Sequence, residues 1–147
     1  MHASPVPAWP IVKTGLPPET LLLPRLLVNQ LLHQAQSSHT QMTWGIIAAL
    51  DDMPGHCYPL AQNHYPAEER ISVALKMLAH RGERLWAVYR TDSGEASAPA
   101  PAELTPFGAR LFLAISLGTK GVLQLAGWRM DNSGILELEV AICETQT

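Results

Sequence analysis

The sequence predicts a single mixed α/β (α+β) domain, in which a β-sheet carries helices on its faces. Three observations predict this fold class. The chain has 147 residues, a length that suits one domain. Its hydrophobic share is 47% and its charged share 16%, which is typical of a chain with a packed core. Apolar runs of strand length also alternate with two segments of helical periodicity.

The chain begins with a proline-rich arm, residues 1–19, which contains Pro5, Pro7, Pro10, Pro17 and Pro18. Proline has no backbone N–H to give to a helix or an inner strand. We therefore expect this arm to be extended, either loose or draped over the surface, and residues 20–147 to form the domain.

The first half of the domain is expected to alternate between strand and helix. Residues 25–36 have apolar side chains at helical spacing, and residues 43–50 form a continuous apolar run, typical of a central strand covered on both faces. The predicted elements are a strand over 21–23, a helix over 25–36, a strand over 43–50, a turn over 51–55 and a strand over 56–62.

The second half starts with the helix that has the clearest signals. Pro66 stands at its start, Glu68 and Glu69 occupy its first turn, and Gly82 follows its end. The acidic start suits the helix dipole. The predicted elements are this helix over 66–82, a strand over 83–90, a loop over 91–102, strands over 111–117 and 121–130, a turn over 131–134 and a strand over 135–142.

Charge and composition narrow the function classes. A net charge of −3 and a pI near 6.0 predict no nucleic-acid surface. No stretch reaches the ~18 apolar residues of a membrane span, and the N-terminus lacks a signal-peptide core. Cys57 and Cys143 lie far apart and form no CxxC motif. We expect two buried thiols in the cytoplasm, with a single disulfide as the alternative.

Several positions together carry a family resemblance. The segment Met-Thr-Trp-Gly-Ile-Ile over 42–47 contains Gly45, Asn63 precedes the second helix, the apolar strand over 85–89 ends before Arg90, and Trp128 lies on a late strand. In order and spacing, residues 20–142 resemble the JAMM/MPN (JAB) domain of bacterial type. That family includes zinc isopeptidases that cut ubiquitin or ubiquitin-like proteins from their partners. The resemblance implies a single JAMM/MPN-like domain.

The catalytic and metal-binding residues of that family are nearly all replaced in this sequence. Its pattern has a glutamate three residues before the glycine, then His-x-His, seven residues, a serine, two residues and an aspartate. The matching positions here are Met42, Arg90, Asp92, Ala100 and Glu103. A shifted register does not restore the site, because no Asp or Glu lies between Thr20 and Leu50 and no histidine follows His80.

The replacements remove the chemistry of a zinc hydrolase. Zinc lowers the pKa of its bound water from about 15.7 to about 7, which corresponds to roughly 12 kcal/mol of hydroxide stabilisation. Arg90 has no lone pair with which to bind a metal. Met42 cannot shuttle a proton, and Ala100 has no hydroxyl to stabilise an oxyanion. We therefore expect no catalytic residues, no metal and no cofactor.

A physical hypothesis explains the charges at residues 90–103. Residues 90 and 92 lie on the same side of a strand, so Arg90 is expected to supply the positive charge that zinc supplies in the family, held between Asp92 and Glu103. The alternative is an ordinary mobile loop whose charges are solvated.

Two functions from different classes remain. The resemblance implies a silent binding or scaffold domain whose partner is a ubiquitin-like protein or another JAMM/MPN domain, with the partner's tail along a strand edge near the groove. The sequence does not distinguish this binding or scaffold domain from a structural protein that forms homo-oligomers. The alternative is a zinc-dependent (iso)peptidase with a site rebuilt from Asp92, Glu103 and either His56 or His64.

The remaining candidates are expected to be structural. The spacings between histidines match no tight metal motif, and Cys57 has no neighbouring base. The tryptophans lie on predicted strands, where core packing is expected. These residues are His33, His39, His56, His64, Cys57, Trp44, Trp86 and Trp128.

Overall fold

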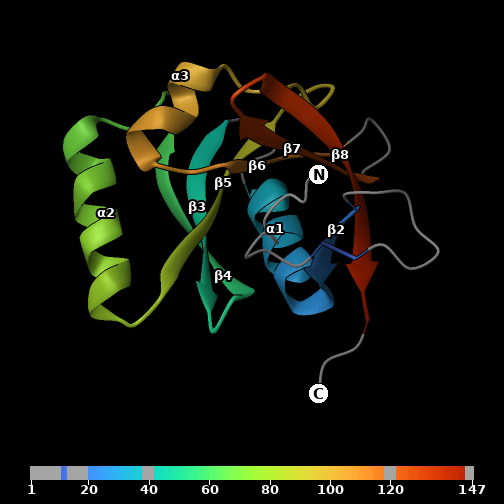
Figure 1. Ribbon diagram of the computed structural model, residues 1–147. Helices are drawn as coiled ribbons and strands as arrows, with labels where there is room; N and C mark the ends of the chain where they lie inside the picture. Colours follow the sequence, from blue (N-terminus) through green and yellow to red (C-terminus); the bar gives the residue numbers. More distant parts are fainter. Residues whose placement is uncertain (1–10, 13–19, 38–41, 118–121, 145–147) are drawn as a thin grey trace.

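One mixed, curled β-sheet organises the computed structural model, which describes residues 11–12, 20–37, 42–117 and 122–144 (Figure 1). The described strands are β1 Ile11–Val12, β2 Thr20–Pro24, β3 Thr43–Leu50, β4 Met53–Gln62, β5 Arg84–Asp92, β6 Leu111–Leu117, β7 Leu123–Asp131 and β8 Gly134–Cys143. Their order in the sheet is β1-β2-β8-β7-β6-β5-β3-β4. The predicted fold class, a mixed sheet with helices, is confirmed.

Two of the strand pairs are parallel, β2 with β8 and β5 with β6, and the other neighbours are antiparallel. Parallel neighbours cannot be joined by a hairpin and need a crossover. The crossover from β5 to β6 contains the short helix α3, Pro101–Leu104, and the 3-10 turn η1, Thr105–Phe107. This crossover brings the loop after β5 back over the end of the sheet.

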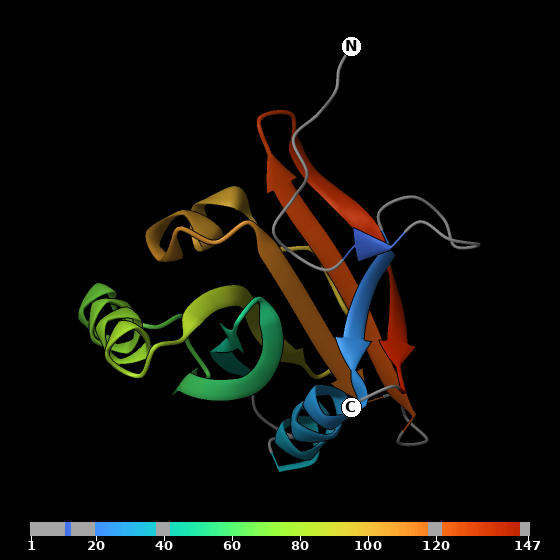
Figure 2. The same cartoon turned by 60° about the horizontal axis from the view of Figure 1, so that its bottom comes forward.

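The two predicted helices are present as α1, Arg25–Ser37, and α2, Glu68–His80. They cover different faces of the sheet (Figures 1 and 2). The apolar side of α1 packs into a cluster with Tyr89 and Leu113, whereas α2 packs into a second cluster with Trp44 and Phe112. Because successive side chains of β5 alternate between faces, Tyr89 belongs to the first cluster and Arg90 faces the second.

Several predicted boundaries are wrong by one to three residues; the helix expected over 66–82, for example, is Glu68–His80. The turn expected over 51–55 is only Asp51 and Asp52, which have φ angles of 54° and 66°, so β4 begins at Met53. Such left-handed pairs form the two-residue hairpin turns that match the twist of a sheet. The loop expected over 91–102 is also shorter, because β5 continues to Asp92 and α3 begins at Pro101.

Some predictions fall outside the described residues. These concern most of the proline-rich arm, the position of His39 and the first residue of the strand expected over 121–130. Of the arm, Ile11 and Val12 are described and pair with Leu21 and Thr20. None of the helices in the described ranges combines the length and hydrophobicity that a membrane crossing requires.

Candidate functional site

Arg90 lies near the centre of the sheet, although it is a charged residue. On β5 it is in register with Trp44 of β3 and Ala114 of β6. Only 7% of its surface is exposed. The centre of its guanidinium lies 5.5 Å from the Trp44 ring centroid and 5.0 Å from that of Phe112. These aromatic faces stabilise a cation while they exclude water from it.

Asp92 neutralises this buried cation. Arg90 Nε donates to Asp92 Oδ1 at 2.5 Å, and Nη2 donates to Oδ2 at 2.9 Å. The pair is bidentate, which is the strongest arrangement of these two groups. Strand alternation places both side chains on one side, as the sequence predicts. The Asp92 side chain is only 10% exposed, so the pair is a buried ion pair.

Ser97 forms hydrogen bonds to both Arg90 and Asp92, and these bonds hold the loop that follows β5 against the ion pair. Arg90 Nη2 donates to the Ser97 carbonyl at 2.6 Å and to its hydroxyl at 2.9 Å, and the Ser97 N–H donates to Asp92 Oδ2 at 3.1 Å. The hydroxyl of Ser116 on β6 donates to the Gly94 carbonyl and holds the same loop. The alternative of solvated charges is therefore wrong for Arg90 and Asp92.

Glu103 does not join the pair, so this half of the predicted ion cluster is wrong. Its carboxylate Oε1 accepts the backbone N–H of Ala100 at 2.9 Å, which satisfies a donor at the start of α3. Its backbone carbonyl accepts the hydroxyl of Tyr65 at 2.7 Å. Among the described residues, no hydrogen bond or ion pair links Glu103 to Arg90. Glu103 shapes the crossover and leaves Asp92 as the partner of the arginine.

Two substitutions of Glu103 distinguish its role as a hydrogen-bond acceptor from a role as a paired charge. Because an amide oxygen accepts the Ala100 N–H as a carboxylate does, Glu103→Gln is expected to change the free energy of unfolding by less than about 0.5 kcal/mol, whereas Glu103→Ala costs about 1 kcal/mol. Denaturant unfolding of both variants measures this. If Glu103→Gln lowered the free energy of unfolding as much as Glu103→Ala does, the negative charge of Glu103, and not only its acceptor oxygen, would stabilise the fold.

The other two family-matched positions lie beside the same crossover and strand. Ala100 is the residue before α3. Met42 immediately precedes β3, and its side chain packs against the cluster that contains Trp44. The Met42 carbonyl accepts the N–H of Asn63 at 2.7 Å, and Asn63 has the left-handed φ of 70°. Asparagine tolerates this conformation better than most residues, which explains why it suits this position.

The histidines proposed for a rebuilt zinc site are engaged elsewhere. His56 Nδ1 lies 3.4 Å from Glu83 Oε2, and His64 Nδ1 lies 2.9 Å from the carbonyl of Tyr65. Within the ranges that the structure describes, no three His, Cys, Asp or Glu side chains are grouped so that they could hold a metal ion. Asp92 and Glu103 therefore do not converge with either histidine.

Cys57 is half-buried on β4, and burial raises the pKa of its thiol from the ordinary 9.0 to about 11. Burial likewise raises the pKa of the neighbouring Tyr89 hydroxyl. A thiol held in its neutral form is a weak nucleophile, because only the thiolate attacks. The packing of Cys57 against the first core cluster agrees with the small buried side chain that the sequence predicts.

The raised pKa predicts a loss of stability in alkali. The folded chain holds the Cys57 proton more tightly than the unfolded chain does, so this contribution is complete below 9.0 and is lost as the pH rises through about 11. Over that range, the free energy of unfolding is expected to fall more steeply in the wild type than in Cys57→Ala. Denaturant titrations at several pH values compare the slopes, and identical slopes would contradict the assignment.

No sequence pattern points to Ser97, and for Trp44 the sequence predicts core packing alone. Trp44 is indeed 2% exposed, but its ring also covers the Arg90 guanidinium. Its position opposite residue 90 depends on the pairing of β3 with β5, which are separated by β4 and α2 in the chain. From the sequence alone, an aromatic residue on a central strand can either pack in the core or cover a neighbouring cation, and only the strand register shows that Trp44 does both.

Comparison with known proteins identifies the class of fold. No protein-family model and no curated protein matches the chain. A protein of Desulfitobacterium hafniense has a similar structure, with a TM-score of 0.60, 15% identity and coverage of 86% of this chain and 94% of that one. A protein of Salinibacter ruber gives a TM-score of 0.56, 12% identity, and coverage of 86% and 93%.

A third similar structure is a JAB1/MPN domain protein of Archaeoglobus fulgidus. It has a TM-score of 0.53, 14% identity, and coverage of 82% of this chain and 99% of that one. At these identities the likeness concerns the fold alone. The chain therefore has an MPN-like fold, as the spacing of its framework residues predicts.

Proposed function

We propose that this chain is a catalytically silent MPN-like domain of bacterial type, which serves as a protein-binding or scaffold module in the cytoplasm. The observation that supports this most is the buried pair of Arg90 and Asp92. It occupies the two positions that match the metal-binding histidines of the family that the sequence resembles. The pair is neutral, bidentate and covered by aromatic rings.

The side chains at this position do not fit a zinc ion. Arg90 offers only donors, and its positive charge repels a second cation. Asp92 already uses both carboxylate oxygens for Arg90 and Ser97. Releasing Asp92 to a metal would leave the guanidinium buried without a counter-charge, which costs several kcal/mol. The proposal therefore includes no metal and no other cofactor.

The proposed partner is a protein, either ubiquitin-like or a second MPN domain. This choice rests on the resemblance, because silent members of that family pair with active ones or hold complexes together. Nucleic acid is not proposed as a partner, because the net charge is −3 and the pI is near 6.0.

Affinity purification followed by reconstitution tests the proposal. The wild-type domain serves as bait, mass spectrometry identifies the captured proteins, and each candidate is purified and mixed with the domain. The expected result is a stoichiometric complex whose partner stays intact when zinc is added. Zinc-dependent cleavage of the partner would instead support the isopeptidase alternative.

A further inference from the structure

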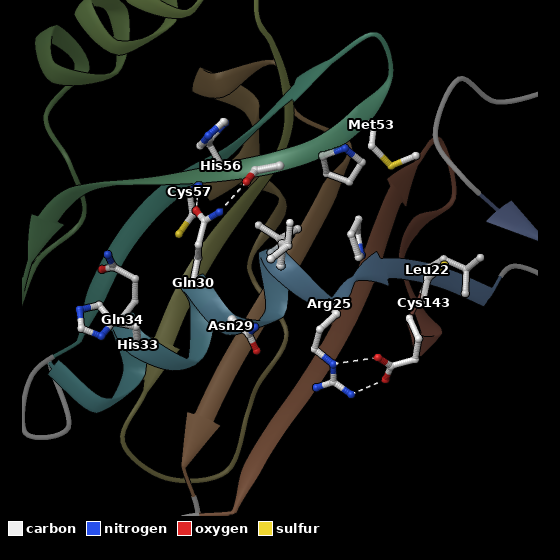
Figure 3. Close-up of a pocket in the computed structure, with 16 residues that line it drawn as sticks. Leu22, Arg25, Asn29, Gln30, His33, Gln34, Met53, His56, Cys57 and Cys143 are labelled. Atoms are coloured by element: carbon white, nitrogen blue, oxygen red, sulfur yellow. Dashed lines mark hydrogen bonds and ion pairs between the residues drawn. The ribbon is translucent and has the colours of Figure 1, made fainter. Parts of the chain in front are cut away.

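A groove lies where the two ends of the curled sheet approach each other. β1 and β4 are the first and last strands in the sheet order, yet β2 and β4 are in contact. The groove has a volume of about 1130 Å³ and runs between α1 and the start of β4, beside the end of β2 (Figure 3). Its apolar lining includes Leu22, Pro24, Leu26, Met53 and Pro54.

Two of these apolar side chains are largely exposed, one on each wall. Leu26 of α1 is 70% exposed, and Met53 of β4 is 58% exposed. The charged residues at the end of the groove, Arg25 and Glu144, form an ion pair with each other. An uncharged, apolar segment that covers this surface removes Leu26 and Met53 from water, which is favourable.

The backbone of β4 inside the groove already has hydrogen-bond partners. Gln30 Nε2 donates to the Gly55 carbonyl at 2.6 Å, and Gln30 Oε1 accepts the Cys57 N–H at 3.1 Å. An occupant therefore contacts side chains here and does not pair with these two groups. A segment with few N–H groups suits such a surface, because each buried donor without a partner costs free energy.

The register of β1 directs the preceding part of the chain toward this groove. β1 is antiparallel to β2, with Ile11 opposite Leu21. The same register, extended backward by two residues, places residue 9 opposite Leu23, beside Pro24 at the start of the groove. Leu21 and Leu23 belong to the core cluster that includes the apolar side of α1, so residue 9 would lie on the α1 side. Residue 9 is a tryptophan.

The composition and length of residues 1–10 also match the groove. Their sequence, MHASPVPAWP, contains no Asp, Glu, Lys or Arg, and its prolines have no N–H that could be left unpaired. In a polyproline conformation, ten residues extend about 31 Å. The wall of the groove on α1, from Arg25 to Gln34, is about 15 Å long. The segment is therefore long enough to cross the groove.

We propose that residues 1–10 occupy the groove of their own molecule, with the Trp9 ring packed against Leu26 and Met53. The prolines restrict the segment to extended conformations, which lowers the entropy that is lost when it binds. A partner can use this surface only after residues 1–10 have left it. The inference does not depend on the proposed function.

Quenching of tryptophan fluorescence by acrylamide tests the proposal in the full chain. The other three tryptophans, Trp44, Trp86 and Trp128, are 2%, 8% and 7% exposed. A quencher dissolved in water therefore reports mainly on Trp9. Subtracting the fluorescence of the Trp9→Phe variant isolates the contribution of Trp9.

Two variants change the groove, and a third is the matched control. Leu26→Glu and Met53→Glu each place a charge on one apolar wall, at a position exposed enough for the fold to tolerate it. Val73→Glu makes the same kind of change at a 63% exposed residue of α2, which covers the other face of the sheet. Circular dichroism verifies that each variant is folded.

The quenching constant of Trp9 follows the fraction of molecules in which the groove is empty. We expect it to rise about threefold or more in Leu26→Glu and Met53→Glu, and to keep the wild-type value in Val73→Glu. The wild-type value is expected to be the same at all protein concentrations.

Three results would overturn the proposal. The first is wild-type quenching of Trp9 equal to that of free N-acetyltryptophanamide, because the ring would then be in water. The second is unchanged quenching in a folded groove variant, because Trp9 would then pack elsewhere. The third is protection that disappears on dilution, because a second molecule would then cover Trp9.

Discussion

Replacing Arg90 by methionine is expected to lower the free energy of unfolding by about 3–5 kcal/mol, because the substitution leaves the Asp92 carboxylate buried without its counter-charge. The Asp92 side chain is only 10% exposed, so water cannot solvate it without opening the loop. The same change removes both hydrogen bonds from Nη2 to Ser97. Chemical denaturation at neutral pH measures the loss.

Two further variants make this prediction specific. Arg84→Met breaks the ion pair with Asp52, whose side chains are 66% and 59% exposed, and it is expected to cost less than about 1 kcal/mol. The double variant Arg90→Met with Asp92→Asn removes both charges and is expected to be more stable than Arg90→Met alone. If Arg90→Met unfolds like the wild type, the buried pair does not stabilise the fold.

The second large effect is expected from Gly45→Ala. A Cβ atom at residue 45 would lie 2.5 Å from Cε2 and Cζ of Tyr89 and 2.6 Å from the carbonyl oxygen of Tyr58. Tyr89 is fully buried, and the Tyr58 carbonyl is part of the backbone of β4, so neither can move without disturbing the sheet. We expect a loss of about 3 kcal/mol or more in the free energy of unfolding.

Gly55→Ala provides the control for this second prediction. Gly55 lies on the neighbouring strand β4, and a Cβ there would meet nothing within 4 Å. The expected change is within about 0.5 kcal/mol. Both variants are compared by denaturant unfolding under the same conditions. Equal stabilities of the two variants would show that the close approach of the Tyr89 ring does not determine the residue at position 45.

The elements that the sequence predicts best are those whose burial is uniform or strictly periodic. β3 is buried along seven of its eight residues, and this appears in the sequence as an unbroken apolar run. The helix α2 buries Ile71, Ala74 and Leu78 at helical spacing and begins with acidic residues. The pairing of Arg90 with Asp92 is likewise local, because it depends only on the alternation of one strand.

What the sequence does not reveal depends on contacts between distant segments. The helix α3 has only four residues, so it is too short to show periodicity. The hydrogen bond from Ser116 to Gly94 joins residues 22 apart and holds the loop that brings Ser97 to Arg90. The spacing of the family pattern predicts that Glu103 contacts Arg90, whereas its carboxylate accepts the backbone N–H of Ala100.

The zinc content of the purified protein tests the central claim most directly. The claim is that a buried arginine–aspartate pair has taken the place of the metal in an MPN-like fold. Protein purified without chelators and analysed by inductively coupled plasma mass spectrometry is expected to contain far less than one zinc per chain. One tightly bound zinc per chain, lost when Asp92 is replaced by asparagine, would contradict the account.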